Sequence, residues 1–300
     1  MTGIVFQTNS TGAVVKGVSD QYADGKMAKV YKAFIGDTNL RTENYKNFLI
    51  DLLKKKGCRR ILDVACGTGI DSVMLLEEGF DVVSTDGSDK MLKYAFETRW
   101  ARRKEPAFDK WIIREANWLD LYDEIKDLVG EGFDAVICFG SSFAHLLDSQ
   151  GDQREQKQAI ANFEKCLKPG GLLLVDHRNY DQLVDSCNAP KKCVFYDSNS
   201  ITNITTSVLS VMGKPALVIR DYTVENGENK DVKSGSNSES KSTTELRLMF
   251  YPHMMQDFRK MLQEVFGENS KYVTLGDFKN LDEIKNPLFY IHLVEKQRKM

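Results

Sequence analysis

The stretch LDVACGTGIDSVML, residues 62–75, decides the fold class of this 300-residue chain. Its apolar start ends at Asp63, the glycines Gly67 and Gly69 follow, and an amphipathic segment comes next. A strand, a glycine turn and a helix in this order begin a βαβ unit, and open parallel sheets bind ligands at the carboxyl ends of their strands. The stretch therefore predicts a ligand against this strand end, where glycine removes Cβ atoms that would keep a ligand from the backbone.

The glycine pattern limits the ligand that this turn can hold. The segment CGTGID, residues 66–71, supplies only two glycines of the dinucleotide fingerprint G-x-G-x-x-G, and Ser72 stands where the third would be. No G-K-[ST] follows, as a phosphate-binding P-loop requires. The turn therefore favours a ligand that need not carry phosphate, although the same pattern alone is also typical of a tight strand-to-helix connection that binds nothing.

Two further strand ends carry side chains that suit a nucleoside. Asp86 ends the apolar run FDVVSTD, and a carboxylate at that place can accept both hydroxyls of a ribose. The next strand end offers Asn117 and Trp118, which suit the polar edge and the aromatic face of an adenine. A ligand with a ribose and no pyrophosphate fits S-adenosylmethionine, so the three strand ends together predict an adenosyl site.

Strand and helix patterns alternate through the first two thirds of the chain. Apolar runs typical of buried strands lie at 59–65, 80–86, 110–117, 133–140 and 172–177. Helical patterns lie at 24–56, 70–79, 88–104 and 154–171, the last ended by Pro169-Gly170-Gly171. Ser88 or Asp89 suits the N-cap of the third helix. Short apolar runs separated by helices predict an α/β fold with a mostly parallel sheet covered on both faces.

The rhythm changes after about residue 188. Strand patterns at 204–212, 215–224 and 244–253 follow one another without helices, which predicts an antiparallel extension. A further helix at 254–267 and a last strand at 287–296 complete the chain. The domain organisation predicted from these changes is an N-terminal arm (1–20), a ligand-binding core (21–187), an antiparallel lid (188–253) with a polar loop (226–243), and a C-terminal helix and strand (254–300).

Composition excludes several classes of function. The net charge of −2 argues against a general electrostatic grip on nucleic acid or on an anionic membrane. The N-terminus lacks a secretory signal pattern, and no apolar run is long enough to cross a membrane. The six cysteines form no C-x-x-C pair, which favours reduced thiols in the cytoplasm. The four histidines show no H-x-x-x-H spacing, so we expect no metal.

Longer motifs connect the chain to one family. They are DQYADG (20–25), IGDT (35–38), LDVACGTG (62–69), DKMLKYA (89–95), EPAFDKW (105–111), EANW (115–118), FDAVIC (133–138), SFAHL (142–146), DHRNYD (176–181), TTSVL (205–209) and DYTV (221–224). Over nearly its full length the chain resembles the glycine N-methyltransferases, which are Rossmann-like, class I enzymes dependent on S-adenosylmethionine.

The resemblance implies an activity and partners. The activity is methylation of glycine to sarcosine, with S-adenosyl-L-methionine as co-substrate and no metal. The partners implied are a homotetramer, in which an N-terminal arm reaches a neighbouring subunit, and a reduced folate that inhibits the enzyme. These expectations come from the family motifs and not from composition or spacing.

The motif match also carries over site positions. The expected cofactor positions are Tyr22, Tyr31, Phe34, Arg41, Ala65, Gly67, Asp86, Ser88, Asn117, Trp118 and His145. The expected catalytic and substrate positions are Tyr22, Ser141, Arg178, Tyr196 and Tyr222, with Arg178 matching the arginine that holds the amino acid carboxylate.

Departures from the family gather around the substrate. The family has tryptophan at Tyr31, tyrosine at Phe34, asparagine at Ser141, tyrosine at Phe250 and an acid at Lys16. Each tyrosine-to-phenylalanine change removes a hydroxyl that could orient a small polar substrate, and each lost hydrogen bond costs about 0.5–1.5 kcal/mol. Three interpretations stay open: methylation of glycine, methylation of sarcosine or another small carboxylated amine, and binding of cofactor or folate with little turnover.

Overall fold

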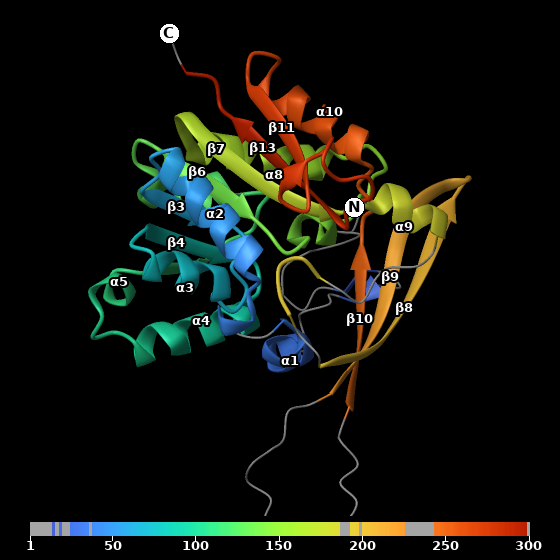
Figure 1. Cartoon of the computed structure of the whole chain (residues 1–300), viewed down its shortest axis with the longest axis horizontal. Coiled ribbons are helices and arrows are strands. Elements are labelled where there is room, and N and C mark those ends of the chain that lie inside the picture. Colours follow the sequence, from blue (N-terminus) through green and yellow to red (C-terminus); the bar gives the residue numbers. More distant parts are fainter. Residues whose placement is uncertain are drawn as a thin grey trace, which may run out of the picture.

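The computed structural model describes residues 14–15, 18–19, 25–35, 38–186, 193–197, 200–225 and 243–298; of 14–15, 18–19, 32–35 and 38 it describes the backbone alone. Within these ranges the chain forms an eight-stranded sheet, a three-stranded sheet and a short two-stranded pair (Figure 1). The short pair joins β1 (Val14–Val15) to β2 (Val18–Ser19). The two larger sheets position the site.

The eight-stranded sheet is mostly parallel, as the sequence predicts. Its strands are β3 (Arg60–Asp63), β4 (Asp81–Asp86), β5 (Ile112–Glu115), β6 (Phe133–Cys138), β7 (Leu167–Arg178), β11 (Lys271–Gly276), β12 (Lys279–Asn280) and β13 (Phe289–Glu295). Their order is β12-β11-β13-β7-β6-β3-β4-β5, with the pairs from β7 to β5 parallel and the remaining pairs antiparallel. Because the chain leaves β3 toward β4 and later returns beside it as β6, the carboxyl end of β3 is the switch point where such sheets bind ligands.

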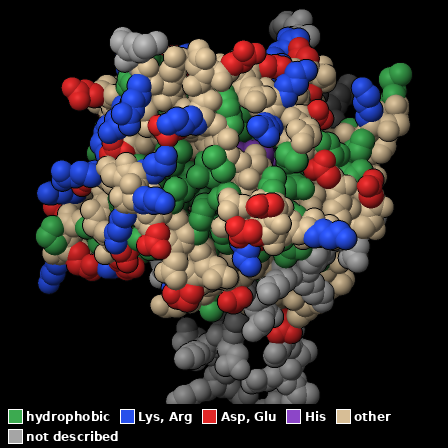
Figure 2. All heavy atoms as spheres, turned by 45° about the horizontal axis from the view of Figure 1, so that its top comes forward, with side chains coloured by type: hydrophobic (Ala, Val, Ile, Leu, Met, Phe, Trp, Pro, Cys, Tyr) green, Lys and Arg blue, Asp and Glu red, His purple; other side chains and the backbone are tan. Residues whose placement is uncertain are grey.

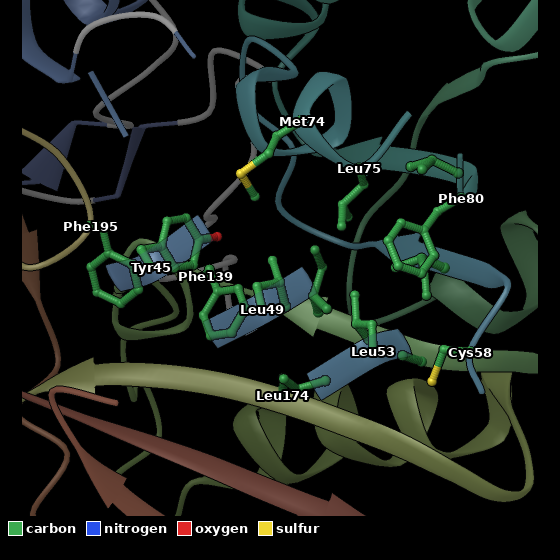
Figure 3. Packing of buried hydrophobic residues seen from close by; sticks show 14 of the residues in the cluster. Tyr45, Leu49, Leu53, Cys58, Met74, Leu75, Phe80, Phe139, Leu174 and Phe195 are labelled. Atoms are coloured by element: carbon green, nitrogen blue, oxygen red, sulfur yellow. The ribbon is translucent and has the colours of Figure 1, made fainter. Parts of the chain in front are cut away.

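Helices cover both faces of this sheet because its strands are apolar on both sides. Along β3, Ile61 belongs to the buried cluster with α2 (Glu43–Lys55) and α3 (Ile70–Glu77), and Leu62 belongs to the cluster with α8 (Arg154–Cys166) and α10 (Met255–Phe266). Figure 3 shows how the first cluster joins α2 to α3 and to the sheet. The members that it labels are Tyr45, Leu49, Leu53, Cys58, Met74, Leu75, Phe80, Phe139, Leu174 and Phe195. This double cover confirms the predicted class.

The three-stranded sheet is antiparallel, as expected for the extension after residue 188. Its order is β10 (Thr243–Phe250), β9 (Lys214–Glu225), β8 (Ile201–Val211). Its buried face packs against α1 (Lys26–Ile35) and α9 (Tyr180–Ser186) in a third apolar cluster. Figure 1 shows this sheet beside the end of the main sheet where β7 meets α9. The limits of the lid and of the core as domains stay a prediction.

Further helical segments connect these elements. They are the 3-10 turns Thr38–Leu40 and Ser142–His145 and the helices α4 (Asp89–Ala101), α5 (Pro106–Asp109), α6 (Leu121–Glu124) and α7 (Lys126–Val129). The segment expected as one helical pattern from 24 to 56 contains α1, the first 3-10 turn and α2. Thr42 starts α2 because its hydroxyl accepts a hydrogen bond from the amide of Tyr45.

The helix expected at 154–171 ends earlier. It stops at Cys166, and β7 begins at Leu167 and runs through Pro169-Gly170-Gly171. The register between β6 and β7 shifts here, and Gly170 has φ +78° while its amide bonds the carbonyl of Lys296 at 3.0 Å. The glycines therefore form an irregular strand start and not a helix stop. The sequence reading also missed β11 and β12.

Some expectations lie outside the described residues. They concern the N-terminal arm expected at 1–20, apart from the backbone of β1 and β2, and the polar loop, of which residues 226–242 are not described. Of the described helices, none combines the length and apolarity that crossing a membrane requires. On the face in Figure 2, Lys and Arg side chains gather on the left of the view, and Asp and Glu side chains lie mainly below and to the right of them.

Candidate active site

The loop after β3 owes its path to two glycines with different roles. Gly67 has φ +54°, and a Cβ there would lie 3.2 Å from Met91 and 3.7 Å from Tyr31. Gly69 has φ +84°, and its Cβ would lie 2.6 Å from Cη2 of Trp111. The sequence placed both glycines against the ligand, but the structure uses Gly69 to admit the Trp111 ring and places Gly67 in the cavity wall.

A buried chain of hydrogen bonds supports this loop from below. Trp111 Nε1 donates to Ser84 Oγ at 2.7 Å, Ser84 to Ser72 Oγ at 2.8 Å, and Ser72 to Asp63 Oδ2 at 2.6 Å. The Ser72 side chain, which replaces the third glycine of the fingerprint, thus ties α3 to the end of β3. Burial raises the pKa of Asp63 to about 7, against the lowering effect of the Ser72 hydrogen bond.

A cavity of about 600 Å³ opens above the loop. Its walls come from the three strand ends that the sequence singled out, together with the turn after β6. The lining residues are Tyr31, Val64, Ala65, Gly67, Asp86, Gly87, Met91, Ala116, Asn117, Trp118, Ser142 and His145. The convergence of the three strand ends is therefore confirmed, and the volume suits a small ligand.

Asp86 joins the loop to the next helix. Its Oδ2 accepts from the Gly67 amide at 2.8 Å, and its Oδ1 accepts from the Ser88 amide at 2.9 Å. Burial raises the pKa of Asp86 to about 6, although both amide bonds favour the ionised form. Ser88, an expected cofactor position, is buried and its hydroxyl caps α4 by accepting from the Met91 amide. Each carboxylate oxygen of Asp86 keeps acceptor capacity for a ligand hydroxyl.

The opposite wall is aromatic and fixed in place. Trp118 Nε1 donates to the carbonyl of Val64 at 2.6 Å, and its ring stacks on Phe143 at 5.7 Å. Asn117 Oδ1 accepts from the amide of Leu119, which shapes the turn. His145 lies 3.1 Å from the carbonyl of Met249, and burial lowers its pKa to about 4. This wall is thus uncharged near pH 7 and combines the aromatic ring of Trp118 with the polar side chains of Asn117 and His145.

A second cavity of about 780 Å³ continues from the first. The two share Tyr31, Ala65, Ser142 and His145 in their walls. We call the first, which contains the strand ends predicted to bind a nucleoside, the nucleoside lobe, and the second, which contains the positions expected for the substrate, the acceptor lobe. The acceptor lobe brings together the expected positions Arg41, Ser141, Arg178, Tyr196 and Tyr222. It also contains Phe250, one of the departures expected around the substrate. Its further lining residues, which sequence reasoning missed, are Met27, Cys66, Ile70, Asp71, Phe139, Gly140, Phe195 and Leu248.

Two guanidinium groups border the acceptor lobe in different states. Arg41 is buried and pairs through Nε with Asp71 Oδ1 at 2.8 Å. Arg178 extends over the Phe289 ring at 4.5 Å, and no described carboxylate pairs with it. Arg41 already has a carboxylate partner in the protein, whereas Arg178 lines the lobe without one among the described residues, so Arg178 is the cation that can take an incoming carboxylate.

Ser141 occupies an unusual backbone position. Its φ is +57°, and its amide donates to both oxygens of Asp176, at 2.9 and 3.1 Å. Its hydroxyl is buried and finds no partner among the described residues. Asparagine tolerates this left-handed conformation better than serine, which fits the asparagine that the resemblance expects here. The vacant hydrogen-bonding capacity points to a ligand group at this place.

Two expected site residues cannot be placed. Tyr22 lies outside the described residues, and so does the side chain of Phe34. His177, which belongs to the motif DHRNYD, is fully buried and contacts His292 through Nε2 at 3.0 Å. Within the described ranges, no three His, Cys, Asp or Glu side chains are arranged to hold a metal.

Comparison with known proteins decides the family. A family model described as a methyltransferase domain matches residues 62–173. The chain is 49% identical to glycine N-methyltransferase of Rattus norvegicus, over 99% of both chains, and 46% identical to that of Homo sapiens over the same share of each. The chain belongs to the glycine N-methyltransferase family. It is a methyltransferase.

Less similar proteins also match this glycine N-methyltransferase family member. A glycine/sarcosine N-methyltransferase of Parasynechococcus marenigrum is 34% identical, over 87% of this chain and 80% of its own. Among solved structures, an S-adenosylmethionine-dependent methyltransferase from Clostridium acetobutylicum matches with a TM-score of 0.63 at 17% identity, covering 92% of this chain and 99% of that one. The CcbJ methyltransferase from Streptomyces caelestis has a TM-score of 0.66 at 15% identity, covering 97% and 100%. At these identities the structures show the shared fold alone.

Proposed function

We propose that this chain transfers the methyl group of S-adenosylmethionine to the amino nitrogen of glycine, giving sarcosine and S-adenosylhomocysteine. The observation that carries the proposal is Arg178, a guanidinium without a described ion-pair partner at the acceptor lobe, directly next to the nucleoside lobe. A small amino acid bound there would have its carboxylate on Arg178 and its amine toward the sulfonium. Full-length similarity to glycine N-methyltransferases supports glycine as this amino acid.

The nucleoside lobe fits the adenosyl part of the co-substrate. The free acceptor capacity of Asp86 suits the ribose hydroxyls, and Trp118 and Asn117 suit the adenine face and edge. Arg41, half satisfied by Asp71, borders the acceptor lobe and can take the carboxylate of the methionine part. Two carboxylates enter the site in the ternary complex, and two guanidiniums line it.

The chemistry asks the protein mainly for position. The amine lone pair forms a bond to the methyl carbon while the carbon–sulfur bond breaks, its electron pair goes to sulfur, and the nitrogen loses one proton to solvent. Arg178, Tyr196 and Tyr222 would orient the amine in line with that bond, in a pocket closed by the antiparallel sheet. His145 is a poor base because burial lowers its pKa to about 4. The amine must therefore bind unprotonated, and the rate should rise with pH.

A product assay tests the proposed function. We expect purified protein to methylate glycine faster than sarcosine, alanine or β-alanine, with the rate rising between about pH 6.5 and 9 as the bound amine loses its proton. Turnover confined to another amine would replace glycine as substrate. Binding of S-adenosylmethionine without turnover of any amine would reject the enzyme in favour of a cofactor-binding or folate-binding protein.

Affinity for the co-substrate should depend on pH through Asp86. The ionised carboxylate accepts the ribose hydroxyls, and the pKa of Asp86 in the folded protein is raised to about 6. The affinity for S-adenosylmethionine is therefore highest above that pKa, and it falls as the pH drops through the pKa. We expect the Kd for S-adenosylmethionine to rise about tenfold between pH 7.5 and pH 5, as the ionised fraction falls. Calorimetry over this range measures it.

The Asp86→Asn variant is the control for this assignment. Asp63 and Asp176 also have pKa values raised by burial to about 7, and both lie near the site. If Asp86 is responsible, the variant binds weakly at every pH and its Kd stays flat. A pH dependence of the same size in Asp86→Asn would assign the titration to Asp63 or Asp176 instead.

We further propose a homotetramer, an arm at 1–20 that reaches a neighbouring subunit, and inhibition by a reduced folate. The support is the full-length family similarity. We propose a cytoplasmic location, supported by five described cysteines that are buried and form no disulfide. Sedimentation of the purified chain, and titration of turnover with a reduced folate, test the first two proposals.

A further inference from the structure

Arg220 on β9 is fully buried, and no described residue supplies it with an anionic partner. The buried face of β9 carries Val218, Arg220, Tyr222 and Val224 in alternation, and Arg220 has 0% of its surface exposed. Its Nε and both Nη atoms find no hydrogen-bond partner among the described residues. Its guanidinium carbon lies 5.0 Å from the ring centroid of Tyr222. A buried cation in an apolar cluster is unfavourable unless an anion or hydrogen-bond acceptors pair with it.

The surroundings of Arg220 belong to the acceptor lobe. Tyr222, two residues along on the same face, lines this lobe. Leu248 stands directly opposite Arg220 on β10 and lines the same lobe, as does Phe250 opposite Val218. Arg220 therefore lies among three lining positions, but its fully buried guanidinium is not itself part of the lining.

A second buried polar group, the Tyr180 hydroxyl, lies near Arg220. The Tyr180 hydroxyl at the start of α9 is buried and also has no hydrogen-bond partner among the described residues. Arg178 and Arg220 both act electrostatically on this phenol. Burial first, and the Arg178 charge second, lower the pKa of Arg220 to about 10, which leaves it charged at neutral pH.

Two other arginines near the lobe each have the carboxylate partner that Arg220 lacks among the described residues. Arg41 pairs with Asp71 at 2.8 Å, and Arg247, which lies next to Leu248 on β10, pairs with both oxygens of Asp221 at 2.7 and 2.9 Å. The carboxylate of glycine brings one negative charge, and Arg178 can take it. No described anion then compensates Arg220, so the charges that the described residues place at the lobe match a methyl acceptor with two acidic groups better than glycine.

We propose that Arg220 and Tyr180 form a second anion subsite beside Arg178, and that the acceptor lobe also takes an amino dicarboxylate such as aspartate. This inference rests on the proposed function, because it assigns an additional acceptor class to the same site. One carboxylate would pair with Arg178. The other would pair with Arg220 and Tyr180 once the Arg220 guanidinium turns toward the cavity, since neither side chain lines it in this structure. The step is unchanged: the nitrogen–methyl bond forms, the methyl–sulfur bond breaks with its electron pair on sulfur, and one proton leaves the nitrogen.

Binding of unreactive acids tests the subsite without turnover. The protein saturated with S-adenosylhomocysteine is titrated with acetate, malonate and succinate by calorimetry. We expect the better of the two diacids to bind at least about tenfold more tightly than acetate, because it gains a second charge-assisted pair. In Arg220→Leu the diacid should fall to the affinity of acetate, while acetate itself is unchanged. Arg220→Lys, which keeps the charge, should retain part of the preference.

The variants come with internal controls. Leucine suits the apolar cluster around position 220, so Arg220→Leu should fold and melt no lower than the parent protein. Arg247→Leu removes an exposed arginine that points away from the lobe on the neighbouring strand, and it should leave the diacid preference intact. Aspartate turnover, assayed in parallel, should be lost in Arg220→Leu and kept in Arg247→Leu.

Two results would overturn the subsite: equal binding of acetate and both diacids to the parent protein, or a diacid preference that survives in Arg220→Leu. Equal binding would mean that Arg220 does not pair with a carboxylate of the methyl acceptor. Absence of glycine methylation together with a diacid preference lost in Arg220→Leu would reject the proposed function and keep the subsite. Glycine methylation without any diacid preference would do the reverse.

Discussion

Replacing Arg178 by methionine is expected to lower kcat/KM for glycine by about 10²–10³-fold, through a higher KM. The side chain is the cation of the acceptor lobe without a described carboxylate partner, and a charge-assisted pair with a substrate carboxylate in a desolvated site is worth about 2–5 kcal/mol when one side is truncated. Methionine keeps most of the side-chain volume over the Phe289 ring, so the loss reports the charge and not a cavity. Steady-state kinetics over a range of glycine concentrations measures the effect.

The controls separate substrate binding from folding and from co-substrate binding. The Kd for S-adenosylmethionine should stay within about threefold of the parent value, because the nucleoside lobe does not include Arg178. Arg178→Lys keeps the charge but loses the planar fork, and should recover part of the lost activity. Arg247→Met, on an exposed arginine, should be silent. An unchanged KM for glycine in Arg178→Met would remove the carboxylate role and with it the main support for an amino acid acceptor.

The fold and the nucleoside lobe were predictable because local patterns determine them. Short apolar runs separated by amphipathic helices lead to a parallel sheet, and a parallel sheet places all strand ends at one edge. Asp86, Asn117 and Trp118 therefore met in one cavity, although their partners within it were not visible in the sequence. The Pro169-Gly170-Gly171 segment was wrongly predicted to end a helix. These residue types can end a helix or bend a strand, and here the pairing of β7 with β6 determines which occurs.

The acceptor lobe was predictable from the family motifs and not from the residues. Its walls combine α1, the turn after β6, the end of β7 and the antiparallel sheet, which no periodicity connects. Arg220 shows the limit most clearly. In PALVIRDYTV the two faces of the strand both carry apolar residues, so alternation does not show whether Arg220 or Ile219 is buried. The packing of the sheet against α1 and α9 determines that the Arg220 face is buried. Such tertiary packing is not visible in the sequence of the strand.

Replacing Gly69 by alanine should cost more stability and more affinity than any other single-methyl change in the loop. The position has φ +84°, which costs a residue with a Cβ about 1–2 kcal/mol, and the new Cβ would lie 2.6 Å from Cη2 of Trp111. Overpacking of this kind adds about 1–3 kcal/mol. We expect the free energy of unfolding to fall by about 2–5 kcal/mol and the Kd for S-adenosylmethionine to rise at least tenfold, measured by denaturant unfolding and calorimetry.

Gly79→Ala is the matched control, because Gly79 has the same φ as Gly69 but no neighbouring atoms that a Cβ would contact. Gly79 also has φ +84°, and nothing lies within 4 Å of a Cβ built there. Its alanine variant should lose only the conformational part, about 1–2 kcal/mol, with unchanged affinity for S-adenosylmethionine. The difference between the two variants therefore isolates the contact with Trp111.

The route from that contact to the co-substrate runs through the buried hydrogen bonds. A displaced Trp111 weakens its bond to Ser84, and Ser84 is linked through Ser72 to Asp63 at the base of the loop. Trp111→Phe removes the crowding ring atoms together with the Nε1 donor. Added to Gly69→Ala, it should restore part of the stability, while the affinity for S-adenosylmethionine recovers less, because the donor to Ser84 is still missing. If Gly69→Ala and Gly79→Ala prove equally stable and bind equally well, the Trp111 ring can move at little cost and the loop does not depend on this packing.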